Sequence, residues 1–324
     1  MLMFLVNRAA YMYRFVLLLC GLLVSVGVLA GQELPDYPIQ KLSRHVYVIH
    51  GPVGLPNPKN QGFMNNPVVV ITAAGVVVID PGSSLYSGRM VLRQLRSISS
   101  KPVTHVFNSH IHGDHWLGNQ AIRDAYPKVK IYAHPRMIEE AKAGGGDSWV
   151  KIMERVTRGA TAGTRPVYPT HALKDGQLIK VGGISFRVYL GKHQHTMTDA
   201  MIEVVEDSVM VTGDNALYTR IGSMDDGSFR GNIAALDLAI KLNSKVYIPG
   251  HGPSGDASVI KPYKTYLETV YNMASRLSED GLADYEMKGK IAAKLKAYWD
   301  WAGFEIEFGR HISLAVLEYE QAGF

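Results

Sequence analysis

The sequence of 324 residues contains a single cysteine, and charged residues make up only 19% of it. Cys20 lies inside an apolar run near the N-terminus, so the rest of the chain can form neither a disulfide nor a thiolate metal site. Any metal ion held there must be bound through nitrogen and oxygen atoms. The apolar content of 47% is typical of a globular protein rather than of a disordered one.

An excess of positive charge is also missing from most of the chain. The formal net charge is +5, and Arg8 and Arg14 supply two of these charges within residues 1–31, where no acidic residue occurs. The remaining charge is too small to give the strongly basic surface that nucleic-acid binding needs. We therefore expect a small-molecule substrate and no nucleic-acid partner.

Residues 1–31 have the composition of a signal peptide. Arg8 and Arg14 precede a mostly apolar run from Phe15 to Leu29, which ends in the small residues Ala30 and Gly31. This run is shorter than the roughly 20 apolar residues that a helix needs to span a bilayer. The sequence predicts a cleaved leader, export to the periplasm and no stable membrane anchor. A retained anchor is the alternative.

Strand and helix patterns alternate after residue 40. Amphipathic spacing predicts helices over 87–98 and 117–125, and a helical pattern returns from Tyr263 to the end of the chain. Short apolar runs predict strands at 46–49, 68–72, 76–79, 103–107, 130–133, 209–212 and 245–248. Because several strands follow one another through tight turns, the pattern indicates a layered α/β fold with mixed sheets and a C-terminal helical appendage.

Ligand-type side chains are concentrated in one short segment. His110, His112, Asp114 and His115 fall within six positions, after a predicted strand and before a predicted helix. His110 and His112 can point to one side, and a turn at Gly113 can bring the other two around to face them. Imidazole and carboxylate groups in this arrangement can bind two cations from one loop, which a chance run of polar residues explains poorly.

The His-x-His-x-Asp-His segment resembles the metal loop of the metallo-β-lactamase superfamily. Later motifs of that family follow in order: His195 with Thr196 after it, Asp214 after Gly213, and His251 within 249–252. Asp80, in 77–82, matches an aspartate that supports the metal loops from outside. The resemblance covers residues 46–252 and implies a four-layer αββα sandwich with the site at one edge.

The resemblance implies a centre for two metal ions. One ion is expected on His110, His112 and His195, and the other on Asp114, His115 and His251, with Asp214 between them. Zinc is the expected metal, at two ions per chain, although iron and manganese also suit these ligands. His193 is an alternative to His195, but it lacks the following threonine.

The resemblance also implies a division of the chain and a reaction. Residues 1–31 would be the signal peptide, 40–256 the catalytic domain, and 257–324 a C-terminal helical extension. We expect a metal-bound hydroxide, oriented by Asp114, to cleave an ester, thioester or amide bond, including a lactam.

Related enzymes narrow this expectation. β-Lactamases of the family have Cys or Ser where this chain has Asp214, which disfavours efficient lactam turnover. The motifs at 54–58 and 62–66 are similar to those of exported zinc hydrolases associated with sulfur-oxidation and quinoprotein systems. The alternative is a mononuclear iron persulfide dioxygenase, which uses ligands of the type of His110, His112, His195 and Asp214.

Four residues are candidate substrate contacts. Phe63 and Met64 lie in a loop, 51–66, that could form a flap over the site or an ordinary rim loop. His134 ends a predicted strand, where it could touch substrate or have a structural role. Arg220 belongs to a charged segment, 218–230, that could set a charge preference or be a solvated face.

Overall fold

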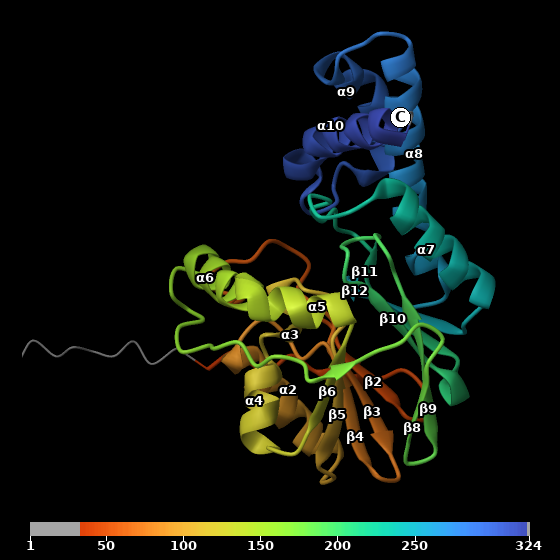
Figure 1. Cartoon of the computed structure of the whole chain (residues 1–324). Helices are drawn as coiled ribbons and strands as arrows, with labels where there is room; N and C mark the ends of the chain where they lie inside the picture. Colours follow the sequence, from red (N-terminus) through yellow and green to blue (C-terminus); the bar gives the residue numbers. More distant parts are fainter. Residues whose placement is uncertain (1–32, 323–324) are drawn as a thin grey trace, which may run out of the picture.

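The described residues, 33–322 of the computed structural model, form two mixed β-sheets that pack face to face (Figure 1). The predicted signal peptide lies outside the described residues. Valine and isoleucine side chains from both sheets fill the space between them, including Val70 and Val77 from one sheet and Ile202 and Val211 from the other. Strands buried on both faces explain the continuous apolar runs in the sequence.

The first sheet contains seven strands in the order of the sequence. Strands β1 to β4 pair antiparallel, and β4 to β7 pair parallel. The strands are β1 (Ile39–Lys41), β2 (Val46–Ile49), β3 (Val68–Thr72), β4 (Gly75–Ile79), β5 (Val103–Phe107), β6 (Lys130–Ala133) and β7 (His171–Ala172). The five strands predicted in this part of the chain are confirmed.

The second sheet has the order β12-β11-β10-β9-β8, with only β11 and β12 parallel. Its strands are β8 (Leu178–Val181), β9 (Ile184–Leu190), β10 (Ala200–Val204), β11 (Val209–Leu217) and β12 (Val246–His251). The predicted ends of two strands, 212 and 248, were wrong. Irregular pairing continues from Gly213 with Pro249 to Leu217 with His251, so Asp214 and His251 lie within strands.

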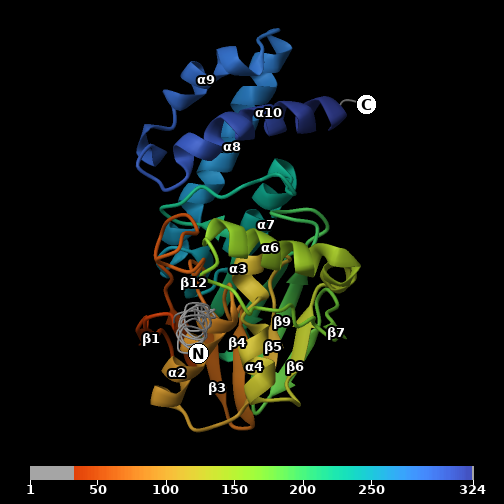
Figure 2. The ribbon, with the colours of Figure 1, turned by 90° about the vertical axis from the view of Figure 1, so that its left-hand side faces the viewer.

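Helices cover the outer face of each sheet: those outside the first sheet face the viewer in Figure 2, and α7 lies outside the second sheet on the right of Figure 1. α2 (Leu85–Ile98) and α4 (Asn119–Ala125) pack on the first sheet, and α7 (Phe229–Leu242) and α8 (Lys261–Glu279) pack outside the second. The αββα order is therefore confirmed. α2 begins at Leu85 because the Ser84 hydroxyl accepts a hydrogen bond from the backbone N–H of Ser87, and the Ser87 hydroxyl accepts one from the backbone N–H of Ser84.

The helix predicted over 117–125 is two shorter helices. α3 (Gly113–Trp116) precedes α4, and Leu117 and Gly118 separate the two helices. A Cβ atom at Gly118 would lie 2.3 Å from the carbonyl oxygen of Pro81, so only glycine allows this close approach. Asp114 and His115 consequently lie on one helical turn instead of in the turn that the sequence suggested.

Two further helices, α5 (Pro135–Glu140) and α6 (Gly146–Val156), cover the edge of the first sheet next to α3 (Figure 1). The buried side chains of Met137 and Met153 pack against Ile111 and Trp116 of the segment that carries the histidines. The Trp116 indole also donates a hydrogen bond to the carbonyl of Ile111 (2.8 Å). These contacts hold the backbone of the histidine-rich segment.

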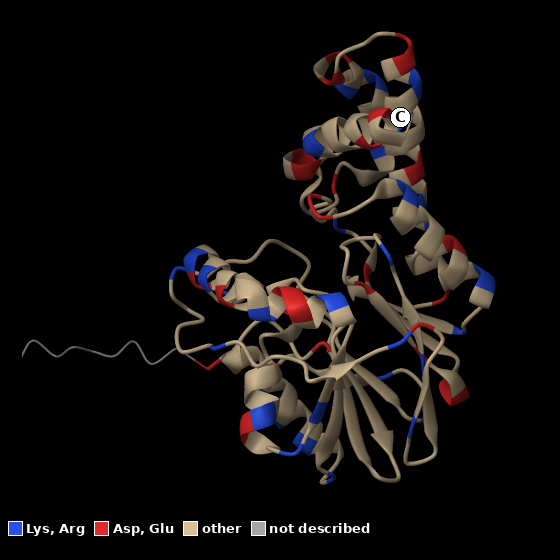
Figure 3. Cartoon of the chain, in the orientation of Figure 1, with Lys and Arg blue, Asp and Glu red and all other residues tan. Residues whose placement is uncertain are grey.

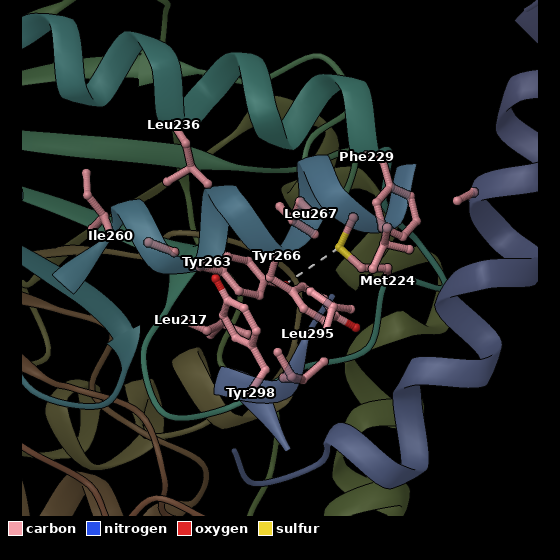
Figure 4. Close-up of a cluster of buried hydrophobic side chains, with 14 of the residues drawn as sticks. Leu217, Met224, Phe229, Leu236, Ile260, Tyr263, Tyr266, Leu267, Leu295 and Tyr298 are labelled. Atoms are coloured by element: carbon pink, nitrogen blue, oxygen red, sulfur yellow. Dashed lines mark hydrogen bonds between the residues drawn. The ribbon is translucent and has the colours of Figure 1, made fainter. Parts of the chain in front are cut away.

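The C-terminal part forms three helices, α8, α9 (Asp284–Ala292) and α10 (Phe304–Ala322), as the helical pattern predicted. They share one core with the second sheet (Figure 4). Tyr263 and Tyr266 of α8 are buried among Leu217 of β11, Leu236 of α7 and Leu295. The C-terminal helices are thus continuous with the two-sheet part through their packing.

Charged side chains lie mainly on the helices and connecting loops, whereas the strands are largely free of them (Figure 3). This distribution follows from the burial of both sheets. Among the described residues, no helix has the length and apolar character that a membrane span requires.

Candidate metal centre

The structure brings together all seven residues predicted to hold metal ions. They come from the segment after β5, the loop between β9 and β10, and the last parts of β11 and β12. Two groups with closely spaced ligand atoms result. One consists of His110, His112, His195 and Asp214, and the other of Asp114, His115 and His251.

Asp214 lies where the two groups meet. Its Oδ1 is 3.1 Å from Nε2 of His115, and its Oδ2 is 3.3 Å from Nε2 of His251. The same Oδ2 lies 3.7 Å from Nε2 of His195 and 4.0 Å from Nε2 of His110. One carboxylate therefore faces histidines of both groups.

The spacings suit divalent metal ions. Two ligand atoms bound about 2.1 Å from one tetrahedral ion lie about 3.4 Å apart. Nδ1 of His112 lies 3.1 Å from Nε2 of His195, and Oδ2 of Asp114 lies 3.2 Å from Nε2 of His251. The nitrogen and oxygen atoms of each group can therefore reach a common ion.

Several of these buried atoms lie close to other ligand atoms but, within the described residues, make no hydrogen bond of regular geometry. They are Nε2 of His110, His115 and His251 and Oδ1 of Asp214. Leaving a buried polar atom unpaired costs about 1–3 kcal/mol, so four such atoms in one place need an explanation. Coordination of cations provides it, and the residues present fit a metal centre.

The electrostatics of the site also favour cation binding. Burial lowers the pKa of His110 well below its ordinary value and that of His195 to about 3, which keeps these rings neutral. Burial alone would raise the pKa of Asp114 and Asp214, but His115 and His251 outweigh it and hold both carboxyl groups below their usual range. Burial would lower the pKa of His115 and His251 as well, but Asp214 and Asp114 outweigh it and raise the pKa of both rings. Neutral imidazoles and ionised carboxylates are the forms that bind metal, so these two rings would release their protons when an ion binds.

Asp80 supports the histidine-rich segment from outside both groups. Its carboxylate accepts hydrogen bonds from the backbone N–H (2.8 Å) and hydroxyl (2.6 Å) of Ser109, and it contacts Nδ1 of His115 at 3.0 Å. The Ser109 hydroxyl in turn contacts Nδ1 of His110 at 2.9 Å. Asp80 has a left-handed backbone (φ 53°), which aspartate tolerates better than most residues and which is common at functional sites.

Gly250 allows the two parallel strands to approach at Asp214. A Cβ atom at position 250 would lie 1.8 Å from Oδ1 of Asp214, far inside contact distance. The absence of a side chain in β12 is therefore a condition for the position of this carboxylate. The motif around His251 therefore needs glycine at position 250.

The predicted substrate contact Phe63 was wrong. Its side chain is fully buried in the core beneath α2, with its ring centre 4.9 Å from that of Tyr37. Met64 is also buried, so the proposed flap does not present it to solvent, and its carbonyl oxygen lies 2.9 Å from Nδ1 of His251. The end of the 51–66 loop is a support of the metal centre and not a lid.

Asn65 and Asn66 are functional neighbours that sequence reasoning missed. Asn65 donates a hydrogen bond to the carbonyl of Asp80 (2.9 Å), and Asn66 donates to those of Pro249 (2.8 Å) and Gly252 (2.7 Å). They connect the loop to both sides of the centre. Their signal was two adjacent asparagines at the end of a Gly/Pro-rich loop, but nothing in that pattern named their partners.

The other two substrate candidates differ in their surroundings. His134 caps α5, with its Nδ1 accepting the backbone N–H of Arg136 (3.1 Å), which favours the structural role. Arg220 is nine-tenths buried, donates a hydrogen bond from Nη1 to the carbonyl of Gly54, and lies 3.4 Å from Sδ of Met64. Within the described residues, no carboxylate lies within 4 Å of its guanidinium.

The αββα fold brings two groups of ligand-type side chains together, and the sequence relatives of this chain are hydrolases. Residues 61–251 match the model of the metallo-beta-lactamase superfamily, and the chain belongs to that superfamily.

Its relatives in sequence have different activities. A probable metallo-hydrolase of Streptococcus pyogenes serotype M6 is 26% identical, covering 58% of this chain and 79% of that protein. A linear primary-alkylsulfatase of a Pseudomonas species is 22% identical (67% and 48% covered). An atrochrysone carboxyl ACP thioesterase of Emericella nidulans is 25% identical (66% and 59%). The chain thus spans only about half of the alkylsulfatase.

Solved structures show the fold. A metallo-beta-lactamase from Pontibacter korlensis matches with a TM-score of 0.57 and 18% identity, covering 72% of this chain and 99% of that one. A sec-alkylsulfatase from a Pseudomonas species matches with a TM-score of 0.69 and 17% identity, covering 87% of this chain and 50% of that one. Residues 1–260 make up only about four fifths of the chain. Because the second match covers 87% of the chain, it extends into the C-terminal helices.

Proposed function

We propose that this protein is an exported dinuclear zinc hydrolase that cleaves an ester-type bond, with a sulfate ester or an acyl thioester as the leading substrates and an amide or lactam as weaker ones. The position of Asp214 carries the proposal. Its Oδ1 lies near His115, and its Oδ2 lies near His251, His195 and His110, at 3.1–4.0 Å. A carboxylate shared between two ligand groups suits two ions at once.

Bound zinc would lower the pKa of water to about 7 and polarise the bond to be cleaved. The chain's own contribution is orientation. Oδ2 of Asp114 lies 3.2 Å from Nε2 of His251, and its side chain remains about one-tenth exposed. Because its pKa is held below the usual range by His115 and His251, Asp114 stays ionised and can accept a hydrogen bond from the attacking water.

The substrate class rests on the relatives and on Arg220. The alkylsulfatase and the thioesterase both act on ester-type bonds, as their names state. Within the part of the chain that the structure describes, no carboxylate lies within 4 Å of this nine-tenths buried guanidinium, which favours a substrate with an anionic group, because an oxyanion would supply the missing counter-charge. We propose that Arg220 contacts that group.

Metal analysis of the purified mature protein tests the proposal, together with hydrolysis of an alkyl sulfate, an acyl thioester, a lactone and a β-lactam. We expect two zinc ions per chain and turnover of one of the first two substrates. Asp114→Asn should abolish most turnover. Asp124→Asn, which changes an exposed aspartate paired with Arg165 at 2.6 Å, is the matched control and should keep it.

The mononuclear iron persulfide dioxygenase is the competing function. His110, His112, His195 and Asp214 would suffice for it, but it assigns no role to the converging Asp114, His115 and His251, which favours the hydrolase. One iron per chain, with oxygen consumption in the presence of a persulfide and no hydrolysis, would reverse this conclusion.

Export is part of the proposal and has its own test. Arg8, Arg14 and the apolar run from Phe15 to Leu29 support it. N-terminal sequencing of the periplasmic protein should find a chain that begins near Gly31. A full-length chain that remains with the membrane fraction would indicate a retained anchor.

A further inference from the structure

The ligand histidines have different neighbours at their second ring nitrogen. For His110, His115 and His251 that nitrogen lies within 3.0 Å of a buried group from the fold's interior: the Ser109 hydroxyl, the Asp80 carboxylate and the Met64 carbonyl, respectively. Nδ1 of His195 is buried without a hydrogen-bond partner among the described residues. For His112 the second nitrogen, Nε2, lies 3.5 Å from an exposed carboxylate, Oδ2 of Asp226.

The two nitrogens of His112 therefore face opposite directions. Nδ1 lies 3.1 Å from Nε2 of His195, inside the first ligand group, while Nε2 is directed to Asp226. An imidazole binds metal through the nitrogen that carries no proton, so Nδ1 is available only when the proton is on Nε2. A carboxylate next to Nε2 stabilises that arrangement and makes Nδ1 more basic.

The backbone holds Asp226 in this position. The carbonyl oxygen of Asp226 lies 3.2 Å from Nε2 of His193, and the N–H of Ser228 donates to the carbonyl of Gln194 (2.8 Å). The segment that carries Asp226 is thus attached to the loop that supplies His195. The Trp149 ring also packs against His112, with its centre 4.9 Å from that of the imidazole.

We propose that Asp226 is a positioning residue that keeps the proton of His112 on Nε2, so that Nδ1 can bind the first metal ion. This inference rests on the proposed dinuclear centre for its metal-binding consequence, although the tautomer itself is a property of the chain. The Asp226 side chain is 66% exposed and borders a groove of about 640 Å³ lined by Ile111 and Thr196. We therefore expect an effect at the lower end of the usual range, about tenfold in metal affinity.

The test compares Asp226→Ala with Asp226→Glu and with Asp225→Ala. Asp225 is the adjacent acid, whose carboxylate pairs with Arg310 at 2.6 Å and with no histidine, so it is a matched control for loss of charge. Proton–nitrogen correlation spectra of the metal-free protein, labelled with ¹⁵N histidine, report the tautomer of each ring. Chelator competition reports the affinity for each zinc ion.

We expect His112 to carry its proton on Nε2 in the wild type and the Asp225 variant, and to populate both tautomers in Asp226→Ala. Affinity for one zinc ion should fall about tenfold in Asp226→Ala, recover in Asp226→Glu and stay unchanged in Asp225→Ala. An unchanged tautomer, or equal losses of affinity in both alanine variants, would overturn the inference. Absence of zinc binding by the wild type would refute the dinuclear proposal, while the tautomer measurement would still decide the role of Asp226.

Discussion

Buried histidines occur in two regions of the molecule, the metal centre and the C-terminal helices. His195 and His311 are both almost fully buried, and burial lowers the pKa of each to about 3. Their neighbours differ. His195 faces the Asp214 carboxylate and another imidazole, whereas Nδ1 of His311 meets the Tyr266 hydroxyl at 2.9 Å.

This comparison separates burial from function. Desolvation makes an imidazole neutral in either region, so a depressed pKa alone does not identify a metal ligand. What distinguishes the metal centre is convergence: several imidazole rings and two ionised carboxylates bring their ligand atoms within reach of one another. Nε2 of His311 is likewise buried without a hydrogen-bond partner among the described residues, but this ring lies against Tyr266 and Phe229 and belongs to no such group.

The largest loss should follow Asp214→Asn, which removes the charge shared by the two groups. We expect hydrolysis to fall by about 10²–10³-fold and metal content to drop to one ion per chain or fewer, because the neutral amide is a poor ligand. Kinetics and metal analysis measure both, with Asp124→Asn as the control. Retention of two ions with full activity would show that Asp214 does not bridge the groups.

Gly250→Ala should disturb the same carboxylate by steric contact alone. The new Cβ atom would lie 1.8 Å from Oδ1 of Asp214, so we expect about 10²-fold lower hydrolysis and a loss of about 1–3 kcal/mol in the free energy of unfolding. The control is Gly289→Ala in α9, where the added atom meets nothing within 4 Å and should raise helix stability by about 1 kcal/mol. Equal rates of hydrolysis in the Gly250→Ala and Gly289→Ala variants would contradict the steric role of Gly250.

Asp80→Asn should weaken the centre less, since asparagine also tolerates the left-handed backbone. The neutral amide of this variant replaces the charged carboxylate that accepts hydrogen bonds from Ser109 and contacts His115. We expect zinc affinity to fall about 10–100-fold, measured by chelator competition, with little change in the circular dichroism spectrum. Unchanged zinc affinity would mean that Ser109 and the packing of Trp116 are sufficient to hold the histidine-rich segment in place.

Arg220→Met should change substrate preference rather than metal binding. Loss of a charged hydrogen bond of about 1.5–3 kcal/mol predicts at least a tenfold fall in kcat/KM for an anionic substrate, with a smaller change for a neutral ester. The zinc content, measured in parallel, should stay at the wild-type value. An equal fall for both substrates would assign Arg220 a structural role through Gly54 and Met64.

Substitution of His311 should leave hydrolysis unchanged and affect only the free energy of unfolding. Because folding lowers its pKa from 6.5 to about 3, the unfolded chain binds a proton between these values that the folded chain does not. Its contribution to stability is therefore complete above pH 6.5 and falls as the pH decreases toward 3, by about 2 kcal/mol between pH 7 and 5.

Denaturant titrations of the wild type and His311→Gln, both with a chelator, measure this contribution. The variant should lose less stability than the wild type over that pH range. The subtraction removes the titration of the site histidines, which both proteins share. Equal pH dependence in the two proteins would show that His311 becomes protonated without unfolding.

The sequence by itself determined the sheets and the identity of the ligand-type residues. Apolar runs located the strands because both faces of each sheet are buried, and the crowding of His110, His112, Asp114 and His115 into six positions marked the metal loop. These features are local, so they can be read from neighbouring residues. Strand ends were less certain: β11 and β12 continue past their predicted ends, since irregular pairing between them replaces the regular pattern.

Only the tertiary structure decided which distant groups support the ligands. Phe63 changed from a substrate contact to a core residue, Met64 contributed a carbonyl to His251, and Asp226 became the neighbour of His112. The contacts of Met64 with His251 and of Asp226 with His112 each join residues more than 100 positions apart in the sequence. Backbone carbonyls and exposed carboxylates occur throughout a chain, so their roles depend on which segments the packing of two sheets brings to one edge.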